Sequence, residues 1–206
     1  MKIVFLIVCF VAGLVASAQD KKATALLNEV SEKTQSFEQI KIGFEYKMIN
    51  KAQGIDETLE GTLLSKGDKY RLEIAGQQII SNGKTMWTFL ESVNEVQINE
   101  ALDDEESFNP RAFLQSWGDN FKASVLNETG SEALLELIPK ETSTFSTAHV
   151  KVDKNKTQLL AISMFDGSGN EFRYSIKSFI TNEGIKDEVF SFDPEEYPGL
   201  EVIDLR

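Results

Sequence analysis

The sequence predicts an α+β fold: a meandering antiparallel sheet of about eleven strands, preceded by one helix and interrupted by a second, shorter one. Two observations lead to this prediction. Apolar residues occupy every second position from residue 40 to residue 48, a period that is typical of a strand with one buried face. Most later segments are short β-rich runs separated by turn residues, and strands joined by short loops pair with their neighbours.

The first 18 residues have the pattern of a secretory signal peptide. Lys2 precedes an apolar run over residues 3–15, and the small residues Ala16-Ser17-Ala18 stand before a charged stretch. This pattern predicts cleavage after Ala18. A membrane anchor is the alternative, but the run is shorter than the roughly 20 residues of a spanning helix. We therefore expect residues 1–18 to be removed and residues 19–206 to form a single exported domain.

Charge and cysteine content narrow the class of protein further. The chain carries 33 Asp and Glu residues against 21 Lys and Arg residues, a net charge of −12. Nucleic acid and anionic membrane surfaces are poor partners for such a chain. The only cysteine, Cys9, lies inside the predicted signal peptide, so the mature chain must be stabilised by its core without disulfides.

The individual elements follow from local patterns. A helix is expected over residues 20–35, where Leu26, Leu27 and Val30 form one apolar face. The pair Asn82-Gly83 is the strongest hairpin signal, because a type I′ turn needs φ > 0 at both central residues. After residues 40–48, strands are expected at residues 59–65, 70–74, 77–81, 85–90, 95–99, 121–126, 133–138, 148–153, 159–165 and 171–180.

One segment interrupts the strands with a helical pattern. Asn109 and Pro110 are typical of a helix cap followed by proline at the first helical position. Phe113 and Trp117 follow at helical spacing, and Gly118 is expected to end the helix. Two large aromatic side chains on one short helix need an apolar surface, so we expect this helix to lie over the open side of the sheet.

Catalytic and metal-binding patterns are weak. The only histidine, His149, stands in a strand-like stretch, and general base catalysis also needs a nucleophile and an orienting partner. The acidic run at residues 103–106 is typical of a solvated loop. Residues 166–170 resemble the start of a calcium loop, but Glu171 stands where that loop needs glycine. We expect no enzyme, no cofactor and no metal site; an enzyme acting on lipids or glycans is the least favoured hypothesis.

Aromatic residues are the remaining feature of interest. Phe44 with Tyr46, and Trp87 with Phe89, are spaced to share a strand face. Such residues fit an ordinary core, and they also fit an apolar cavity between a curved sheet and its helices. The pattern alone leaves both interpretations open.

Two stretches and the C-terminus resemble one known family. Residues 61–71 (GTLLSKGDKYR) and 79–89 (IISNGKTMWTF) are similar to the glycine, basic turn and aromatic hairpin of the outer-membrane lipoprotein carrier (LolA) family. Residues 190–194 (FSFDP) and 198–206 (PGLEVIDLR) resemble the C-terminus of that family. Asn109-Pro110, before Phe113-Leu114, stands at the place of its internal helix. The resemblance covers essentially the whole mature chain.

The resemblance implies an incomplete, unclosed antiparallel β-barrel whose mouth is covered by helices around an apolar pocket. It also implies a periplasmic carrier without a cofactor. Nothing in the sequence demands a partner subunit, so we expect a monomer. Such a carrier would take lipid-modified proteins from an inner-membrane ATP-driven transporter, shield their acyl chains and release them to an outer-membrane acceptor. A sensor or lipid-binding module on the same fold, without a transport role, is the alternative function.

On this basis we expect an acyl-chain cavity and a basic latch that holds its lid. In the turn Lys66-Gly67-Asp68, Gly67 occupies the position where the family has a basic residue. The latch is therefore either absent or supplied by another residue, for which Arg71 and Arg111 are the candidates. The expected cavity lining is Phe44, Tyr46, Leu63, Trp87, Phe89, Phe113 and Trp117.

Overall fold

The computed structural model describes residues 5–101 and 110–206, with side chains described over residues 20–101, at Leu114 and over residues 116–206. Within these residues the α-helices are α1 (Phe5–Ser36) and α2 (Pro110–Asn120). Three short 3-10 helices are η1 (Glu91–Val93), η2 (Asp187–Phe190) and η3 (Pro194–Glu196). The strands are β1 (Gln39–Asn50), β2 (Ile55–Lys66), β3 (Lys69–Ile74), β4 (Gln77–Ser81), β5 (Thr85–Leu90), β6 (Glu95–Glu100), β7 (Phe121–Glu128), β8 (Glu132–Pro139), β9 (Phe145–Asp153), β10 (Gln158–Asp166), β11 (Glu171–Thr181) and β12 (Glu201–Asp204).

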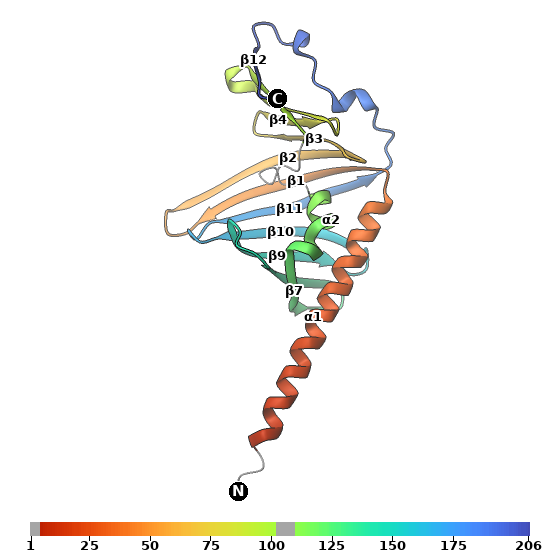
Figure 1. Cartoon of the computed structure of the whole chain (residues 1–206), viewed down its shortest axis with the longest axis vertical. Helices are drawn as coiled ribbons and strands as arrows, with labels where there is room; N and C mark the ends of the chain where they lie inside the picture. The colour runs from red at the N-terminus through yellow and green to blue at the C-terminus, as the bar shows by residue number, and fades with distance from the viewer. Residues whose placement is uncertain (1–4, 102–109) are drawn as a thin grey trace. The chain divides into compact units, whose positions relative to one another are not determined.

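These strands form one sheet in the order β12-β6-β5-β4-β3-β2-β1-β11-β10-β9-β8-β7 (Figure 1). The end strands of this order, β12 and β7, have no pairing with each other, so the described sheet is unclosed. Pairing is antiparallel from β2 to β6 and from β7 to β10, whereas β12 runs parallel to β6. The predicted fold class, an unclosed and mainly antiparallel sheet with two helices, is confirmed. The strand β12 was not predicted.

Both predicted helices are present, but the residues at which they begin or end differ from the prediction. Helix α1 begins at Phe5, so it runs through most of the predicted signal peptide before it reaches the helix expected over residues 20–35. Helix α2 begins at Pro110, as predicted, but passes Gly118 and ends at Asn120. Within the described part of the chain, no helix combines the length and the apolar character that a membrane span requires.

The described residues divide into two compact units. Unit 1 comprises residues 5–36, 49–55 and 110–173, and therefore holds both α-helices and β7–β10. Unit 2 comprises residues 37–48, 56–101 and 174–206, and holds most of β1 and β11, β2–β6, η1–η3 and β12.

The core of unit 1 lies between the sheet and its helices. Leu135, Val150 and Ile162 are aligned across β8, β9 and β10 by the strand register, and all three are buried. Helix α1 packs on β7, on β10 and on α2, and its Leu27 and Val30 are fully buried. Alternation on the strands and helical spacing on α1 thus bring their apolar faces together.

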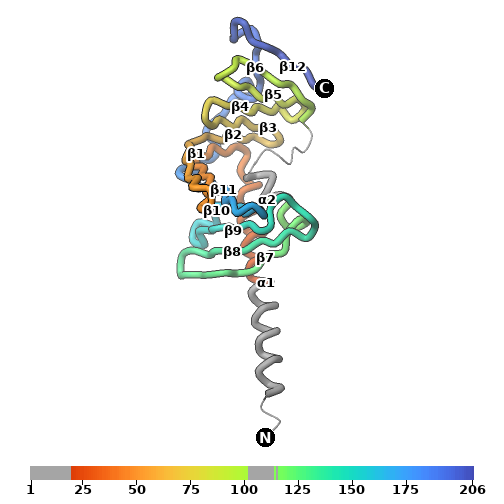
Figure 2. The backbone as a smooth tube through the Cα atoms, turned by 90° about the vertical axis from the view of Figure 1, so that its left-hand side faces the viewer, coloured from red at the N-terminus to blue at the C-terminus, as the bar shows by residue number. Residues whose placement is uncertain are grey.

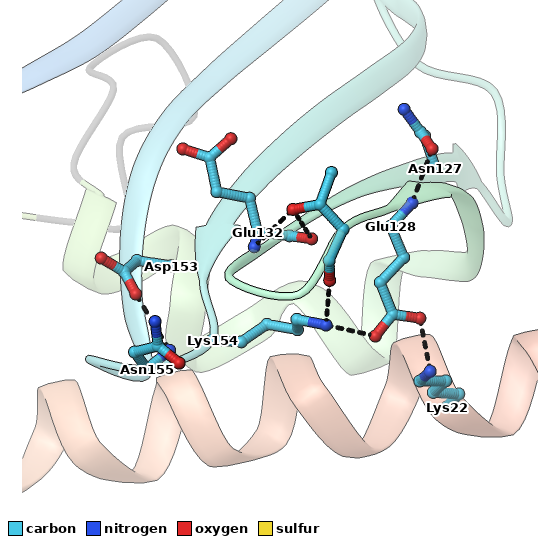
Figure 3. Close-up of polar contacts among 8 residues, drawn as sticks. Lys22, Asn127, Glu128, Glu132, Asp153, Lys154 and Asn155 are labelled. Atoms are coloured by element: carbon cyan, nitrogen blue, oxygen red, sulfur yellow. Dashed lines mark hydrogen bonds and ion pairs between the residues drawn. The ribbon is translucent and has the colours of Figure 1, made fainter.

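Polar contacts tie the exposed side of α1 to two turns of unit 1, and Figure 3 shows the first of them, between Lys22 and Glu128. The Glu128 carboxylate, at the end of β7, pairs with Lys22 of α1 and with Lys154 Nζ, the latter at 2.6 Å. Hydrogen bonds from Lys154 and Lys22 lower the pKa of Glu128. Lys33 of α1 donates to the carbonyl oxygen of Lys156 in the β9–β10 turn. These contacts are at the surface, so they orient the helix more than they stabilise the unit.

The hairpin turns of unit 2 differ in part from the prediction. The hairpin at Asn82-Gly83 is confirmed, but only Gly83 has positive φ, so the type I′ assignment is wrong. Instead, the side-chain oxygen Oδ1 of Asn82 accepts hydrogen bonds from the backbone N–H groups of Lys84 and Thr85, at 2.9 and 2.8 Å. The two-residue turn with positive φ at both positions is Ala75-Gly76, between β3 and β4.

Gly61 allows the close approach of Phe44 to β2. A Cβ atom at Gly61 would lie 2.8 Å from both Phe44 Cε2 and the backbone oxygen of Glu73. We therefore expect Gly61→Ala to destabilise the protein by roughly 1–3 kcal/mol through overpacking, as measured by urea unfolding. The matched control is Gly130→Ala, because a Cβ atom there meets nothing within 4 Å. Equal stability of the two variants would contradict this packing.

Candidate functional site

The strand register of unit 2 assigns each side chain of β2–β6 to one of two faces. Residues paired across neighbouring strands point to the same side of a sheet. We call face A the side that carries the row Leu63, Leu72, Ile79, Thr88 and Gln97, which crosses β2 to β6 in that order. Face B is the opposite side. Its corresponding row is Leu64, Arg71, Ile80, Trp87 and Ile98. Figure 2 shows these five strands in succession.

Face A is apolar over β2 and β3, includes Ile79 on β4, and continues onto β1 and β11. Leu63 and Phe44 are buried in its centre, and Phe44 lies 5.9 Å from Tyr174 between ring centroids. Tyr46 and Tyr174 are 5.0 Å apart on the same measure. Half-buried apolar side chains of this cluster are Phe37, Tyr46, Tyr70, Leu72, Ile74, Tyr174, Ile176 and Phe179. An apolar surface of this kind offers dispersion contacts and hydrophobic burial to a ligand without charged groups.

Tyr46 and Tyr174 of face A are neutral at physiological pH, because the pKa of each is raised. Burial raises the pKa of Tyr174 to about 12, and neighbouring Tyr46 adds to that increase. Burial and then the Glu57 carboxylate raise the pKa of Tyr46. The phenol groups therefore add apolar ring surface and hydroxyl dipoles to face A without adding charge.

Face B is apolar in a different place, over β4, β5 and β6. Ile80, Phe89 and Val96 are buried there, and Trp87 is half-buried against them. The C-terminal segment (residues 182–206) covers this part of face B (Figure 2). Its side chains Phe192 and Tyr197 lie 5.4 and 4.6 Å from Phe89 between ring centroids. This part of face B is therefore filled by the chain itself.

Charged residues of β2 and β3 hold the beginning of the C-terminal segment. Lys66 Nζ and Lys69 Nζ contact the two carboxylate oxygens of Asp187 at 2.8 and 2.9 Å. These hydrogen bonds, that from Lys66 first, lower the pKa of Asp187 to about 2. Arg71 Nη1 donates to the backbone oxygen of Val189 at 3.5 Å, and Arg71 Nη2 donates to Gln78 Oε1 at 2.9 Å.

The structure separates the predicted cavity residues instead of bringing them together. Phe44, Tyr46 and Leu63 belong to the face A cluster, whereas Trp87 and Phe89 lie on face B beneath the C-terminal segment. Trp87 and Phe89 share one strand face, as predicted, but the register puts that face opposite the one that carries Leu63. That these residues line an acyl-chain cavity stays a prediction. On β5 it is Thr88 that faces the Leu63 side.

The other predicted site residues lie elsewhere. Trp117 is buried in unit 1, where α2 packs on α1 and β7. The side chains of Phe113 and Arg111 are outside the described residues. Arg71 contacts the C-terminal segment and lies on face B, so it does not latch a cover over face A. Leu72 and Ile79, which the prediction did not include, share face A with Leu63, and Leu72 belongs to an alternating run that the sequence displays.

Two features with weak chemical signals have structural explanations. His149 packs its ring against Phe165, with centroids 4.7 Å apart. The Asp166 carboxylate accepts hydrogen bonds from the backbone N–H groups of Ser168 and Asn170 and from the Asn170 amide. Hydrogen bonds, first from the Asn170 side chain, lower the pKa of Asp166. Among the residues that the structure describes, no group of His, Cys, Asp or Glu could hold a metal ion.

Comparison with known proteins agrees with this architecture. The sequence model of the outer membrane lipoprotein carrier protein LolA family matches residues 56–193, which is more than half of the chain. The chain belongs to the LolA family. The match includes the strands β2–β6 and ends at Asp193, within the C-terminal segment. No curated protein matches the chain in sequence.

Solved structures that are similar to this chain have low sequence identity to it. An uncharacterized conserved protein from Thermus thermophilus shares the fold and is 14% identical, with a TM-score of 0.57 over 89% of this chain and 99% of that protein. A putative outer membrane lipoprotein-sorting protein domain from Vibrio parahaemolyticus is 14% identical, with a TM-score of 0.48 over 84% and 97%. A LolA superfamily protein from Nitrosomonas europaea is 14% identical, with a TM-score of 0.47 over 83% and 98%.

The Asp187 contacts predict a pH-dependent attachment of the C-terminal segment. Because the pKa of Asp187 is lowered from 3.8 to about 2, its contribution to stability is present above about pH 4 and is lost as the pH falls towards 2. We expect Asp187→Asn to be less stable than wild type at neutral pH, with the difference disappearing on acidification to about pH 2 in urea unfolding. In a background with Lys66→Met and Lys69→Met, Asp187→Asn should change stability little at any pH. A difference that persists unchanged at pH 2, or in that background, would contradict these ion pairs.

Proposed function

We propose that this protein is a periplasmic carrier that binds the acyl chains of lipoproteins and shuttles them from the inner to the outer membrane. The observation that supports this most directly is face A: a half-buried apolar surface on β1–β3 and β11, extended by Ile79 on β4, in which Tyr46 and Tyr174 are uncharged. Membership of the LolA family supports the same proposal. Cleavage of a signal peptide after Ala18 would deliver residues 19–206 to the periplasm as a single working domain.

The energetics of acyl chains explain why such a carrier needs an apolar face. Each methylene group removed from water contributes about 0.8 kcal/mol, so an exposed long acyl chain costs on the order of 10 kcal/mol. A carrier has to recover most of this free energy in order to take its cargo from a membrane. It must not recover all of it, because a carrier that binds more tightly than the receiving membrane cannot release its cargo.

The composition of face A suits cargo of varied protein sequence. Hydrophobic burial is non-directional, so Leu63, Leu72 and Ile79 would accept an acyl chain whatever protein it is attached to. The partners in this proposal are lipid-modified proteins, an inner-membrane ATP-driven lipoprotein-releasing transporter and an outer-membrane acceptor. Nucleic acid is not a partner of a chain with net charge −12.

Paired substitutions on neighbouring strands test whether face A binds acyl chains. Leu72→Glu places a carboxylate on face A, and we expect it to weaken binding of a fluorescent fatty acid on the order of 100-fold, because an unpaired charge beside hydrocarbon is costly. The matched control is Leu64→Glu on face B, beside Arg71, which should bind like wild type. Equal binding by wild type and Leu72→Glu, with both folded by circular dichroism, would contradict the proposal.

A transfer assay separates the carrier from a sensor or lipid-binding module. Labelled lipoprotein would be supplied in vesicles that contain the ATP-driven transporter, with acceptor vesicles present. A carrier brings label to the acceptor vesicles in proportion to its own concentration, and Leu72→Glu removes that transfer. A sensor on the same fold retains the label and delivers none.

A further inference from the structure

Face A is not apolar throughout, and along its central row the polarity changes in one direction. Along the row defined above, Leu63, Leu72 and Ile79 on β2–β4 are followed by Thr88 on β5 and Gln97 on β6. The adjacent row also ends in a carboxamide, Asn99 on β6, although it carries Ser81 on β4 and the buried Met86 on β5. With about 4.8 Å between strands, the row from Leu63 to Gln97 extends roughly 19 Å. This length accommodates hydrocarbon at one end and a polar group at the other.

The polar end of face A consists of neutral hydrogen-bonding groups. Thr88, Gln97 and Asn99 are half-buried, and together they offer a hydroxyl group and two carboxamides. Gln97 Nε2 donates to Glu95 Oε1 at 2.8 Å, which fixes the Gln97 side chain and places a carboxylate beside it. Glu95 lies on face A as well, because it pairs with Leu90, which in turn pairs with Gln77. A donor-bearing surface next to a carboxylate favours neutral carbonyl groups and disfavours anions.

We propose that Thr88, Gln97 and Asn99 form a headgroup site for the neutral, carbonyl-bearing end of an acylated ligand. This inference rests on the proposed function and makes it more specific. The acyl chains lie over Leu63, Leu72 and Ile79, and the ester or amide groups that join them to glycerol or peptide lie over β5 and β6. Glu95 makes the site select against an anionic phosphate headgroup. The protein thereby distinguishes neutral acylated ends from the anionic phospholipids of the membrane around them.

The test compares two ligands with identical acyl chains, a diacylglycerol and the corresponding phosphatidic acid. Wild type should bind the diacylglycerol at least roughly tenfold more tightly, a ratio within reach of a few hydrogen bonds and one repulsive charge. The double variant Thr88→Val, Gln97→Leu keeps side-chain size and removes the polar groups. We expect this variant to lose most of its affinity for diacylglycerol. It should bind hexadecane, a pure hydrocarbon probe, at least as tightly as wild type does.

Two further variants separate charge from hydrogen bonding. Glu95→Gln should raise the affinity for phosphatidic acid and leave that for diacylglycerol unchanged. Thr85→Val is the control on face B, because Thr85 pairs with Glu100 on that side, and it should bind both ligands like wild type.

The outcomes distinguish this inference from the proposed function. If wild type binds hexadecane and both lipids equally well, or if the double variant keeps the wild-type preference, the headgroup site is wrong and the apolar face stands. If wild type binds none of the three ligands, the proposed function itself is wrong. Circular dichroism and the urea midpoint of each variant establish that it is folded.

Discussion

The packing of the C-terminal segment on face B is the contact on which the rest of unit 2 depends. Phe192 and Tyr197 cover Phe89, and Phe190 is fully buried, so the apolar side chains on face B of β4–β6 are covered by the protein's own chain. The sheet of unit 2 therefore has apolar residues on opposite sides at its two ends: face B over β4–β6 and face A over β1–β4. The first is filled by the chain, and the second presents half-buried side chains, which gives the proposed ligand its place.

The two apolar regions meet at β4, and consecutive residues there serve different purposes. Ile80 is fully buried in the face B core, whereas Ile79 pairs with Leu72 and Thr88 on face A. Because side chains alternate along a strand, one pair of neighbouring residues contributes both to stability and to the proposed site. The charged residues of β2 and β3 complete the division. Lys66, Lys69 and Arg71 on face B bind the start of the C-terminal segment and leave face A of these strands without a basic side chain among the described residues.

Much of the fold could be predicted from local patterns, but the site could be predicted only in part. Alternation located β1 and showed that Trp87 and Phe89 share a face, because the two-residue period of a strand is a local property. It could not show whether that face carries Leu63 or lies on the opposite side of the sheet. That choice depends on Phe192 and Tyr197, about a hundred residues later in the chain, and on the strand register. The parallel strand β12 was missed for the same reason, since its pairing with β6 is set by long-range packing. The break at Ala75-Gly76 was predicted, but the positive φ of Ala75 was not, because alanine seldom adopts it.

The most direct test of the account is to locate a bound acyl chain on one of the two faces. A fatty acid with a nitroxide group near its methyl end would broaden the methyl NMR signals of residues close to it. The account predicts broadening at Leu63, Leu72 and Ile79 on face A, with sharp signals from Ile80 and Val96 on face B. Broadening of Ile80 and Val96 with sharp signals on face A would show that the ligand displaces the C-terminal segment, and would contradict the account.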